Sequence, residues 1–495
     1  MDALQKLAQI RQGSGPSQTT GLSQACLEKF LAQDPLLSQA IDEALHAKKR
    51  LMSEFPSLSQ LREADLIRHL QAGFVNFYPE DQTNPYVPIA ARGPWIVTFH
   101  GAVIHDSGGY GMLGFGHAPA HVLDAMNEPH VMANVMTASF SQLRLTERLR
   151  QEIGHARADG FPFDRIICVN SGSESMSVAM RISDINAKRM TGPGALHAGK
   201  KPMFLTVRGG FHGRTERPAM ISNSSLKKYK DTLLSFANLN INVTVPPNDV
   251  SALREAFAWA DREGVFFEAI VLEPVMGEGD PGRALAPDFY KAARELTLEH
   301  GSLLIIDSIQ AGLRARGCLS VVDYPGFRDL PPPDIETYSK AVNAGQYPLS
   351  ILALSDRAAG LYVRGVYGNT KTANPRALDV ALATLDLVTP DLRKNICERG
   401  EEFLRKFGEI AKEFPEIVLK VQGTGLLCAI ELKPEIFQVV GHGQLEEYLR
   451  KKGIGVIHGG ANALRFTPHF RITSAEIDMI CDALREALRH GPRLS

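Results

Sequence analysis

The chain has 495 residues, more than one compact core usually holds, so two or three domains are expected. Hydrophobic residues make up 44% and charged residues 22%, which are ordinary values for a globular protein with a large core. The formal net charge of −1 gives no reason to expect nucleic acid or an anionic membrane as a partner.

The six cysteines are scattered, with no C-x-x-C pair and no spacing typical of metal ligands. They are expected to be reduced core residues, and no metal site is predicted. The first residues lack a basic segment followed by an apolar one, and no apolar stretch approaches the ~18 residues that cross a bilayer. The sequence therefore predicts a soluble, cytoplasmic protein.

Four regions follow one another along the chain. Residues 1–80 have apolar side chains at helical spacing and predict a helical N-terminal extension, used for packing or for a dimer contact. Residues 81–125 change to short strands and glycines and are expected to join a smaller domain. Residues 126–385 alternate apolar strands with helix-length segments, which predicts a large domain around a mostly parallel sheet. Its strands are predicted at 165–169, 203–207, 269–272, 303–306 and 349–354.

Residues 386–495 have the pattern of a small C-terminal α+β domain. A hairpin is predicted over 418–432, turning at the glycines near 424. Thr473 and Glu476 have the spacing of a capping box that opens the last helix.

Two of the loops that follow strands could bind a ligand. Ser171, Gly172 and Ser173 come after a strand and open a helix, where free backbone N–H groups suit a phosphate, although a plain helix cap has the same pattern. The glycine-rich loop 207–215 offers the Phe211 ring for stacking, with His212 beside it, and Arg214 for a carboxylate; a surface turn is the alternative.

Three charged residues follow other predicted strands. Glu273 alone is typical of a solvated loop glutamate. Asp307 comes after four apolar residues, where a carboxylate needs a cation or strong donors. Lys340 alone is typical of a surface lysine, whereas in a tight, desolvated site it could act as a nucleophile or base.

Together these residues supply the parts of a site for pyridoxal phosphate (PLP). Asp307 would keep the pyridine nitrogen protonated, so that the ring accepts the electrons of a carbanion. Lys340 would hold the cofactor as a Schiff base and then move the proton.

The order of the motifs resembles the class III aminotransferases (ornithine, acetylornithine and ω-amino acid type) over residues 84–485. The matching segments, in family order, are 170–174, 209–215, 273–279, 307–310, 340–348 and 368–375. The resemblance implies the α/β architecture of PLP-dependent transferase fold type I, with a large, mostly parallel domain and a smaller α+β domain.

The resemblance also implies roles for single residues at the cofactor. Gly172 and Ser173 would hold the phosphate, and Phe211 would stack on the ring. Gln310 would reach the phenolic oxygen. Thr370 would contact the phosphate bound by the other subunit of a homodimer.

Three further residues resemble the substrate contacts of the family. Glu278 and Arg465 look like a switchable ion pair that opens for a dicarboxylate, and Arg214 looks like a carboxylate receptor. They favour 2-oxoglutarate and glutamate as one substrate pair.

The chain also departs from the family pattern. Ser308 stands where relatives have glutamate, in Asp307-Ser308-Ile309-Gln310, and Lys371-Thr372 replaces an aromatic–glycine pair. The sequence therefore indicates a divergent aminotransferase that moves an amino group from an amine or ω-amino acid to a keto acid. A PLP-dependent aminomutase, racemase or decarboxylase, or a non-catalytic binding protein, remains open, as does the amino donor.

Overall fold

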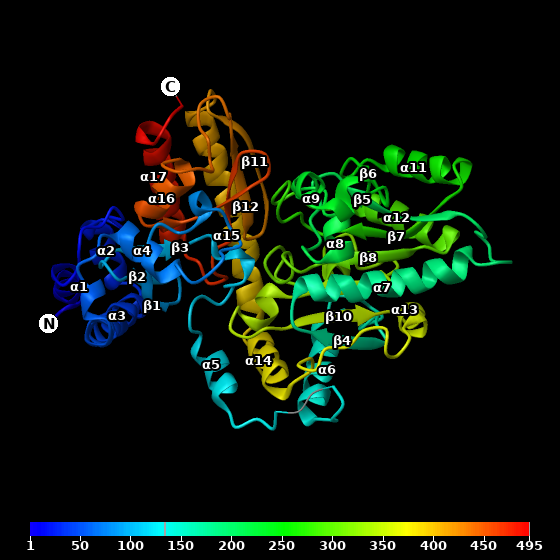
Figure 1. The fold of residues 1–495 in the computed structure, drawn as a ribbon, viewed down its shortest axis with the longest axis horizontal. Helices are drawn as coiled ribbons and strands as arrows, with labels where there is room; N and C mark the ends of the chain where they lie inside the picture. Colours follow the sequence, from blue (N-terminus) through cyan, green and yellow to red (C-terminus); the bar gives the residue numbers. More distant parts are fainter. Residues whose placement is uncertain (133–134, 495) are drawn as a thin grey trace. The chain divides into compact units, whose positions relative to one another are not determined.

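The protein is represented by a computed structural model that describes residues 1–132 and 135–494 (Figure 1). The chain folds into two compact units. The small unit comprises Met1–Ala120, Glu398–Gln422 and Cys428–Ser495, and the large unit comprises His121–Cys397 with Gly423–Leu427. Both units are assembled from segments that are not contiguous in sequence.

The large unit contains a seven-stranded sheet with the order β4-β10-β9-β8-β7-β5-β6. Its strands are β4 (Arg165–Val169), β5 (Lys201–Val207), β6 (Asn242–Val245), β7 (Val265–Leu272), β8 (Leu303–Asp307), β9 (Ile335–Tyr338) and β10 (Ser350–Leu354). Neighbours pair in parallel from β6 to β9, and β10 runs antiparallel to β9 and β4. The expected mostly parallel sheet is confirmed. The carboxyl ends of β4, β5, β7, β8 and β9 therefore lie at one edge of the sheet, where α/β proteins place ligand sites.

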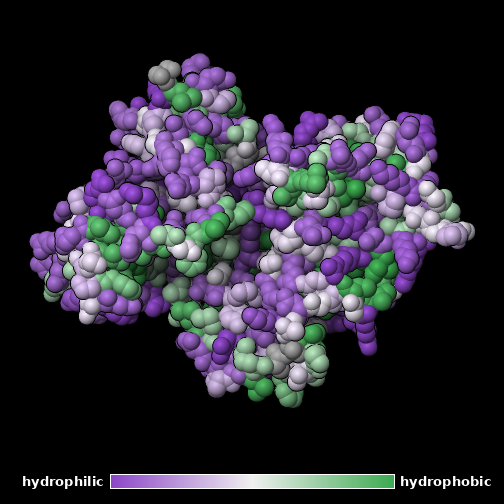
Figure 2. All heavy atoms as spheres, in the orientation of Figure 1, coloured by the Kyte–Doolittle hydropathy of each residue, from purple (hydrophilic) through white to green (hydrophobic). Residues whose placement is uncertain are grey.

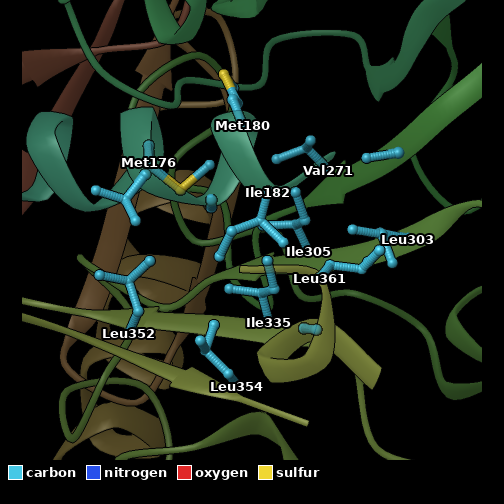
Figure 3. Packing of buried hydrophobic residues seen from close by; sticks show 14 of the residues in the cluster. Met176, Met180, Ile182, Val271, Leu303, Ile305, Ile335, Leu352, Leu354 and Leu361 are labelled. Carbon is cyan, nitrogen blue, oxygen red and sulfur yellow. The ribbon is translucent and has the colours of Figure 1, made fainter. Parts of the chain in front are cut away.

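Helix α7 (Gly172–Thr191) packs across this sheet and contacts β10, β9, β8 and β7. Its inner face supplies Met176, Met180 and Ile182 to a buried cluster with Ile305 and Leu352 of the strands (Figure 3). Each such side chain stabilises the fold by about 1.5–3 kcal/mol. This packing fixes the N-terminus of α7 next to the carboxyl edge of the sheet.

The other helices of the large unit lie between and around the strands. They are α5 (Ala120–Asn127), α6 (Phe140–Glu152), α8 (Glu216–Ile221), α9 (Leu226–Thr232), α10 (Leu234–Ala237), α11 (Val250–Arg262), α12 (Pro287–His300), α13 (Asp356–Leu361) and α14 (Pro375–Asp386). Helix α15 (Pro390–Glu413) starts in the large unit and ends in the small one.

The small unit contains two four-stranded sheets, ordered β1-β2-β3-β13 and β11-β12-β15-β14. Their strands are β1 (Pro88–Arg92), β2 (Trp95–Thr98), β3 (Val103–Asp106), β11 (Val418–Thr424), β12 (Leu427–Leu432), β13 (Ile454–Gly455), β14 (Ile457–Gly459) and β15 (Ala463–Phe466). Helices α16 (Leu445–Lys451) and α17 (Ser474–His490) complete the C-terminal part. The predicted hairpin is confirmed as β11–β12, and the capping box of Thr473 and Glu476 opens α17.

The N-terminal extension is helical, as predicted, and belongs to the packing of the small unit. Its helices are α1 (Ala3–Gln12), α2 (Gln24–Leu31), α3 (Pro35–Glu54) and α4 (Glu63–Gln71). Helix α3 packs on β1 and β2 through buried residues such as Leu37 and Ile41. The Trp95 indole donates to Asp34 Oδ2 over 2.7 Å, which ties the first turn of α3 to the sheet.

Strands β6 and β9 were not predicted. Asn242 and Thr244 give β6 a polar pattern typical of a loop, and β9 is short and contains the charged Glu336. Figure 2 shows a mostly hydrophilic surface broken by separate hydrophobic patches. Among the described residues, no helix combines the length and the apolar character needed to cross a bilayer.

Candidate active site

The loops that leave the carboxyl ends of five strands contact one another at one edge of the large sheet. The loop after β5 meets the loop after β4, because Arg214 N–H donates to Ser173 Oγ over 3.1 Å. The loop after β8 meets the loop after β9, because Lys340 Nζ donates to Gln310 Oε1 over 2.9 Å. The sequence motifs 170–174, 209–215, 273–279, 307–310 and 340 are thus brought together.

The start of α7 forms a small, crowded cradle. Ser171 is the N-cap, and its hydroxyl accepts the N–H of Glu174. A Cβ on Gly172 would lie 2.9 Å from Ile309 Cδ1, so this position leaves no room for a side chain. Gly213 has a φ of +120°, and a Cβ there would lie 2.8 Å from Ser173 Oγ. The cradle therefore presents backbone N–H groups at the start of a long helix, which suits an anion.

Phe211 and His212 lie in the loop that closes this cradle. The Arg214 guanidinium lies over the Phe211 ring, 5.2 Å from its centre. The backbone N–H of His212 donates to Ser222 Oγ over 2.8 Å, and its side chain is buried. Phe211 and Arg214 thus lie next to the cradle, and the roles predicted for them at the cofactor and substrate stay predictions.

Asp307 ends β8 and is buried, as its apolar surroundings in sequence predicted. Its Oδ2 lies 3.1 Å from His212 Nδ1, and its Oδ1 accepts the N–H of Ile309 over 3.1 Å. These donors replace the water that burial removes from the carboxylate. His212 is therefore a partner of Asp307, a link between two loops that their spacing in sequence does not reveal.

The expectation of a solvated Glu273 is wrong. Its carboxylate is buried and accepts the N–H groups of Phe211 (3.0 Å) and Gly277 (2.9 Å). Burial raises its pKa; the nearby His212 lowers it and the charge of Asp307 raises it. Glu273 holds the loops after β5 and β7 together, because its position at a strand end points it into the loop bundle and away from water.

Lys340 follows β9 and is half-buried, which differs from a lone surface lysine. Its φ is +47°, a left-handed conformation that residues other than glycine seldom adopt. Residues on both sides of Lys340 fix this backbone, because Ser339 Oγ and Asn343 Nδ2 both donate to the carbonyl of Leu349. Backbone strain of this kind clusters at functional sites.

A third buried carboxylate at the sheet edge, Glu336, was not predicted at all. It lies on β9 and accepts hydrogen bonds from Ser308 Oγ (2.6 Å), Ser320 Oγ (2.5 Å) and the N–H of Val321 (2.9 Å). Burial raises its pKa to about 7. Because Ser308 lies between Asp307 and Gln310, its bond to Glu336 supports the turn that carries both residues.

Three predicted residues lie apart from these contacts. Glu278 is half-buried in the loop after β7, with Ser224 Oγ 3.5 Å from its Oε1. Thr370 is exposed, next to Asn369, whose side chain donates to Glu174 Oε1. Arg465 is buried on β15 of the small unit. The roles given to these three residues stay predictions.

The residues at the sheet edge fit PLP. Two buried polar atoms, His212 Nε2 and Gln310 Nε2, have no hydrogen-bond partner among the described residues. The Gly172–Gly213 cradle accepts an anion, Phe211 offers a ring face, and Lys340 offers an amine within the same group of loops. The fold and this set of residues define a PLP-dependent enzyme.

Comparison with known proteins gives the family. The family model "Aminotransferase class-III" matches residues 77–488. The chain belongs to the class III aminotransferases, and it is a PLP-dependent aminotransferase. Helices α1 to α4 precede the matched region.

Individual relatives are distant. The acetylornithine aminotransferase of Thermosynechococcus vestitus is 29% identical over 66% of this chain and 75% of its own. The [LysW]-aminoadipate semialdehyde/glutamate semialdehyde transaminase of Sulfolobus acidocaldarius is 27% identical over 77% of this chain and 88% of its own. The structure of ornithine aminotransferase from Toxoplasma gondii has a TM-score of 0.73 at 21% identity, covering 88% of this chain and 98% of that one. These values fit a divergent member of the family.

Proposed function

We propose that this aminotransferase moves the amino group of an amine or ω-amino acid to a keto acid, with 2-oxoglutarate and glutamate as one pair. The observation that carries the proposal is the contact of Lys340 Nζ with Gln310, on the same turn as the buried Asp307. One relative is named an acetylornithine aminotransferase and another a semialdehyde transaminase. A solved structure with a similar fold is that of an ornithine aminotransferase. Ornithine carries a terminal amine, which supports the ω-amino donor.

PLP, when bound, supplies an electron sink for the carbon from which a proton is removed. Lys340 would hold the cofactor through Nζ and afterwards carry that proton on the same atom. Asp307 would accept the pyridine N–H, with His212 keeping Oδ2 in place. Gln310 Nε2 would donate to the phenolic oxygen.

The remaining contacts complete the proposed site. The N–H groups at Gly172 and Ser173 would bind the phosphate, and Phe211 would stack on the ring. Arg214 guanidinium N–H groups would bind a substrate carboxylate.

We further propose a homodimer in which Thr370 contacts the phosphate bound by the partner subunit, and a cytoplasmic enzyme, which the scattered spacing of the cysteines supports.

The test combines a substrate screen with a lysine variant. Purified enzyme is given ω-amines, diamines and amino acids with 2-oxoglutarate or pyruvate, and glutamate or alanine is measured. Lys340→Ala should lose turnover and the visible absorbance of the lysine-bound cofactor, while the control Lys201→Ala, at an exposed position, keeps both. Turnover by Lys340→Ala, or loss of the amine without a new amino acid, would contradict the proposal.

A further inference from the structure

A second group of chemically active side chains lies in the small unit, which contains no residue of the sheet-edge site. It consists of His105 on β3, His469 in the loop after β15, and Glu476 in the first turn of α17. One ligand-type atom of each lies within 4.8 Å of the other two. His105 Nε2 is 3.0 Å and His469 Nε2 is 2.9 Å from the same oxygen, Glu476 Oε1.

Outer hydrogen bonds orient these side chains. His105 Nδ1 lies 2.8 Å from Ser107 Oγ, which turns Nε2 towards Glu476. Glu476 Oε2 accepts both the N–H and the hydroxyl of Thr473 over 2.7 Å, which leaves Oε1 for the imidazoles. Ligand atoms held by a second layer of hydrogen bonds are typical of metal sites.

We propose that His105, His469 and Glu476 bind one divalent first-row transition-metal ion, with Zn²⁺ as the preferred ion. Ligands about 2.0–2.1 Å from a tetrahedral Zn²⁺ are about 3.3 Å from one another. The two N–O separations of about 3 Å are close to that spacing, and all three ligand atoms lie within 4.8 Å of one another, so small side-chain shifts bring them around one ion. Two imidazoles and one carboxylate favour Zn²⁺ over Mg²⁺ or Ca²⁺, which prefer oxygen ligands.

Burial and charge agree with this assignment. The Glu476 and His105 side chains are buried, and a buried carboxylate needs a positive partner. The His469 side chain is 13% exposed, so a water molecule can supply the fourth ligand from that side. The ion would join β3 to the start of α17, and this cross-link does not depend on the proposed substrate.

The experiment measures metal in the full chain loaded with PLP. Protein freed of metal with a chelator is dialysed against Zn²⁺ or Co²⁺, and bound metal is counted by mass spectrometry. We expect one ion per chain, a visible Co²⁺ spectrum of low coordination number and a higher melting temperature with metal.

Two variants test the ligands. His469→Ala and Glu476→Gln should lose that ion, and glutamine still satisfies the capping box, so the second variant should fold. The control is His458→Ala, because His458 also pairs with a buried glutamate, Glu446, but forms no three-ligand group within residues 1–132 and 135–494.

The outcomes separate a metal site from a hydrogen-bonded network. Loss of the ion in both ligand variants and its retention in His458→Ala support the proposal. A chain that takes up no ion, or an uptake that is equal in all three variants, would overturn it. In that case the three side chains form a hydrogen-bonded network without a metal.

Discussion

The backbone of Lys340 is held in a conformation that costs energy. A left-handed φ of +47° in a residue with a side chain costs on the order of 1–3 kcal/mol, so neighbouring contacts must impose it. Ser339 and Asn343 do so through the carbonyl of Leu349, and the Gln310 amide oxygen fixes the amine. Both the backbone and the amine of Lys340 are therefore held by residues of the chain itself.

Glu336 should make the stability of the protein depend on pH. Its folded pKa of about 7 lies above the ordinary value of 4.5, so the folded chain holds a proton that the unfolded chain has lost in this range. The contribution of Glu336 to the free energy of unfolding is fully present below pH 4.5 and is lost as the pH rises through 7. Glu336→Gln should remove this loss, which is on the order of 3 kcal/mol.

Urea unfolding at pH 5 and pH 7 measures the effect. The wild type should lose more unfolding free energy between the two pH values than Glu336→Gln does. Glu263→Gln, at an exposed position, should keep the wild-type difference. Equal differences in wild type and Glu336→Gln would show that Glu336 titrates as an ordinary carboxyl.

The phosphate cradle is a property of two elements, the start of α7 and the loop after β5. Gly213→Ala would place a Cβ 2.8 Å from Ser173 Oγ at a φ of +120°, which residues with side chains rarely adopt. We expect PLP affinity, measured by equilibrium dialysis, to fall by about five- to 150-fold, since strain of about 1–3 kcal/mol acts directly on the cradle.

Gly264→Ala is the matched control for this loss. Gly264 also has a positive φ, +68°, but no atom lies within 4 Å of its Cβ position. It should lower stability slightly and leave PLP affinity unchanged. Equal affinity in the two variants would mean that the cradle is not part of the cofactor site.

The N-terminal extension should contribute to the stability of the small unit. Ile41 of α3 is 0% exposed, so Ile41→Ala should lower the free energy of unfolding by about 2–5 kcal/mol. Leu36→Ala, in the same helix at 37% exposure, should cost much less. Chemical denaturation of both variants tests this, and a similar small loss in both would place α3 outside the cooperative core.

The sequence predicted those elements whose signal is local. Strands such as β8 are short apolar runs, and Thr473 and Glu476 form a capping box within one turn. Strand β9 was missed because Glu336 interrupts its apolar pattern, and only partners from other segments make that burial tolerable. The burial of Glu273 and the contact between His212 and Asp307 were not predicted for the same reason, because these contacts join residues far apart in the chain.

The whole enzyme is proposed to be a homodimer, because Thr370 is exposed in the single chain while the family resemblance assigns it to a phosphate. If Thr370 binds the phosphate in the partner's site, two variants that are inactive alone can form a mixed dimer with one active site. One chain carries Lys340→Ala and the other carries Thr370→Ala.

In a mixed dimer of these chains, one site combines Lys340 of the second chain with Thr370 of the first and is intact. Random mixing makes about half of the dimers mixed, and each mixed dimer has one intact site of its two. About a quarter of all active sites, and so about a quarter of wild-type turnover, should therefore return. The measurement is turnover after the two variants are unfolded and refolded together, compared with each refolded alone. Pairing Lys340→Ala with Asp307→Ala is the control, because both residues come from the same chain's sheet edge and no intact site can form. No recovery in the Thr370 mixture would place Thr370 in its own subunit's site or outside any site. Recovery in the control would contradict the placement of Lys340 and Asp307 in the same site.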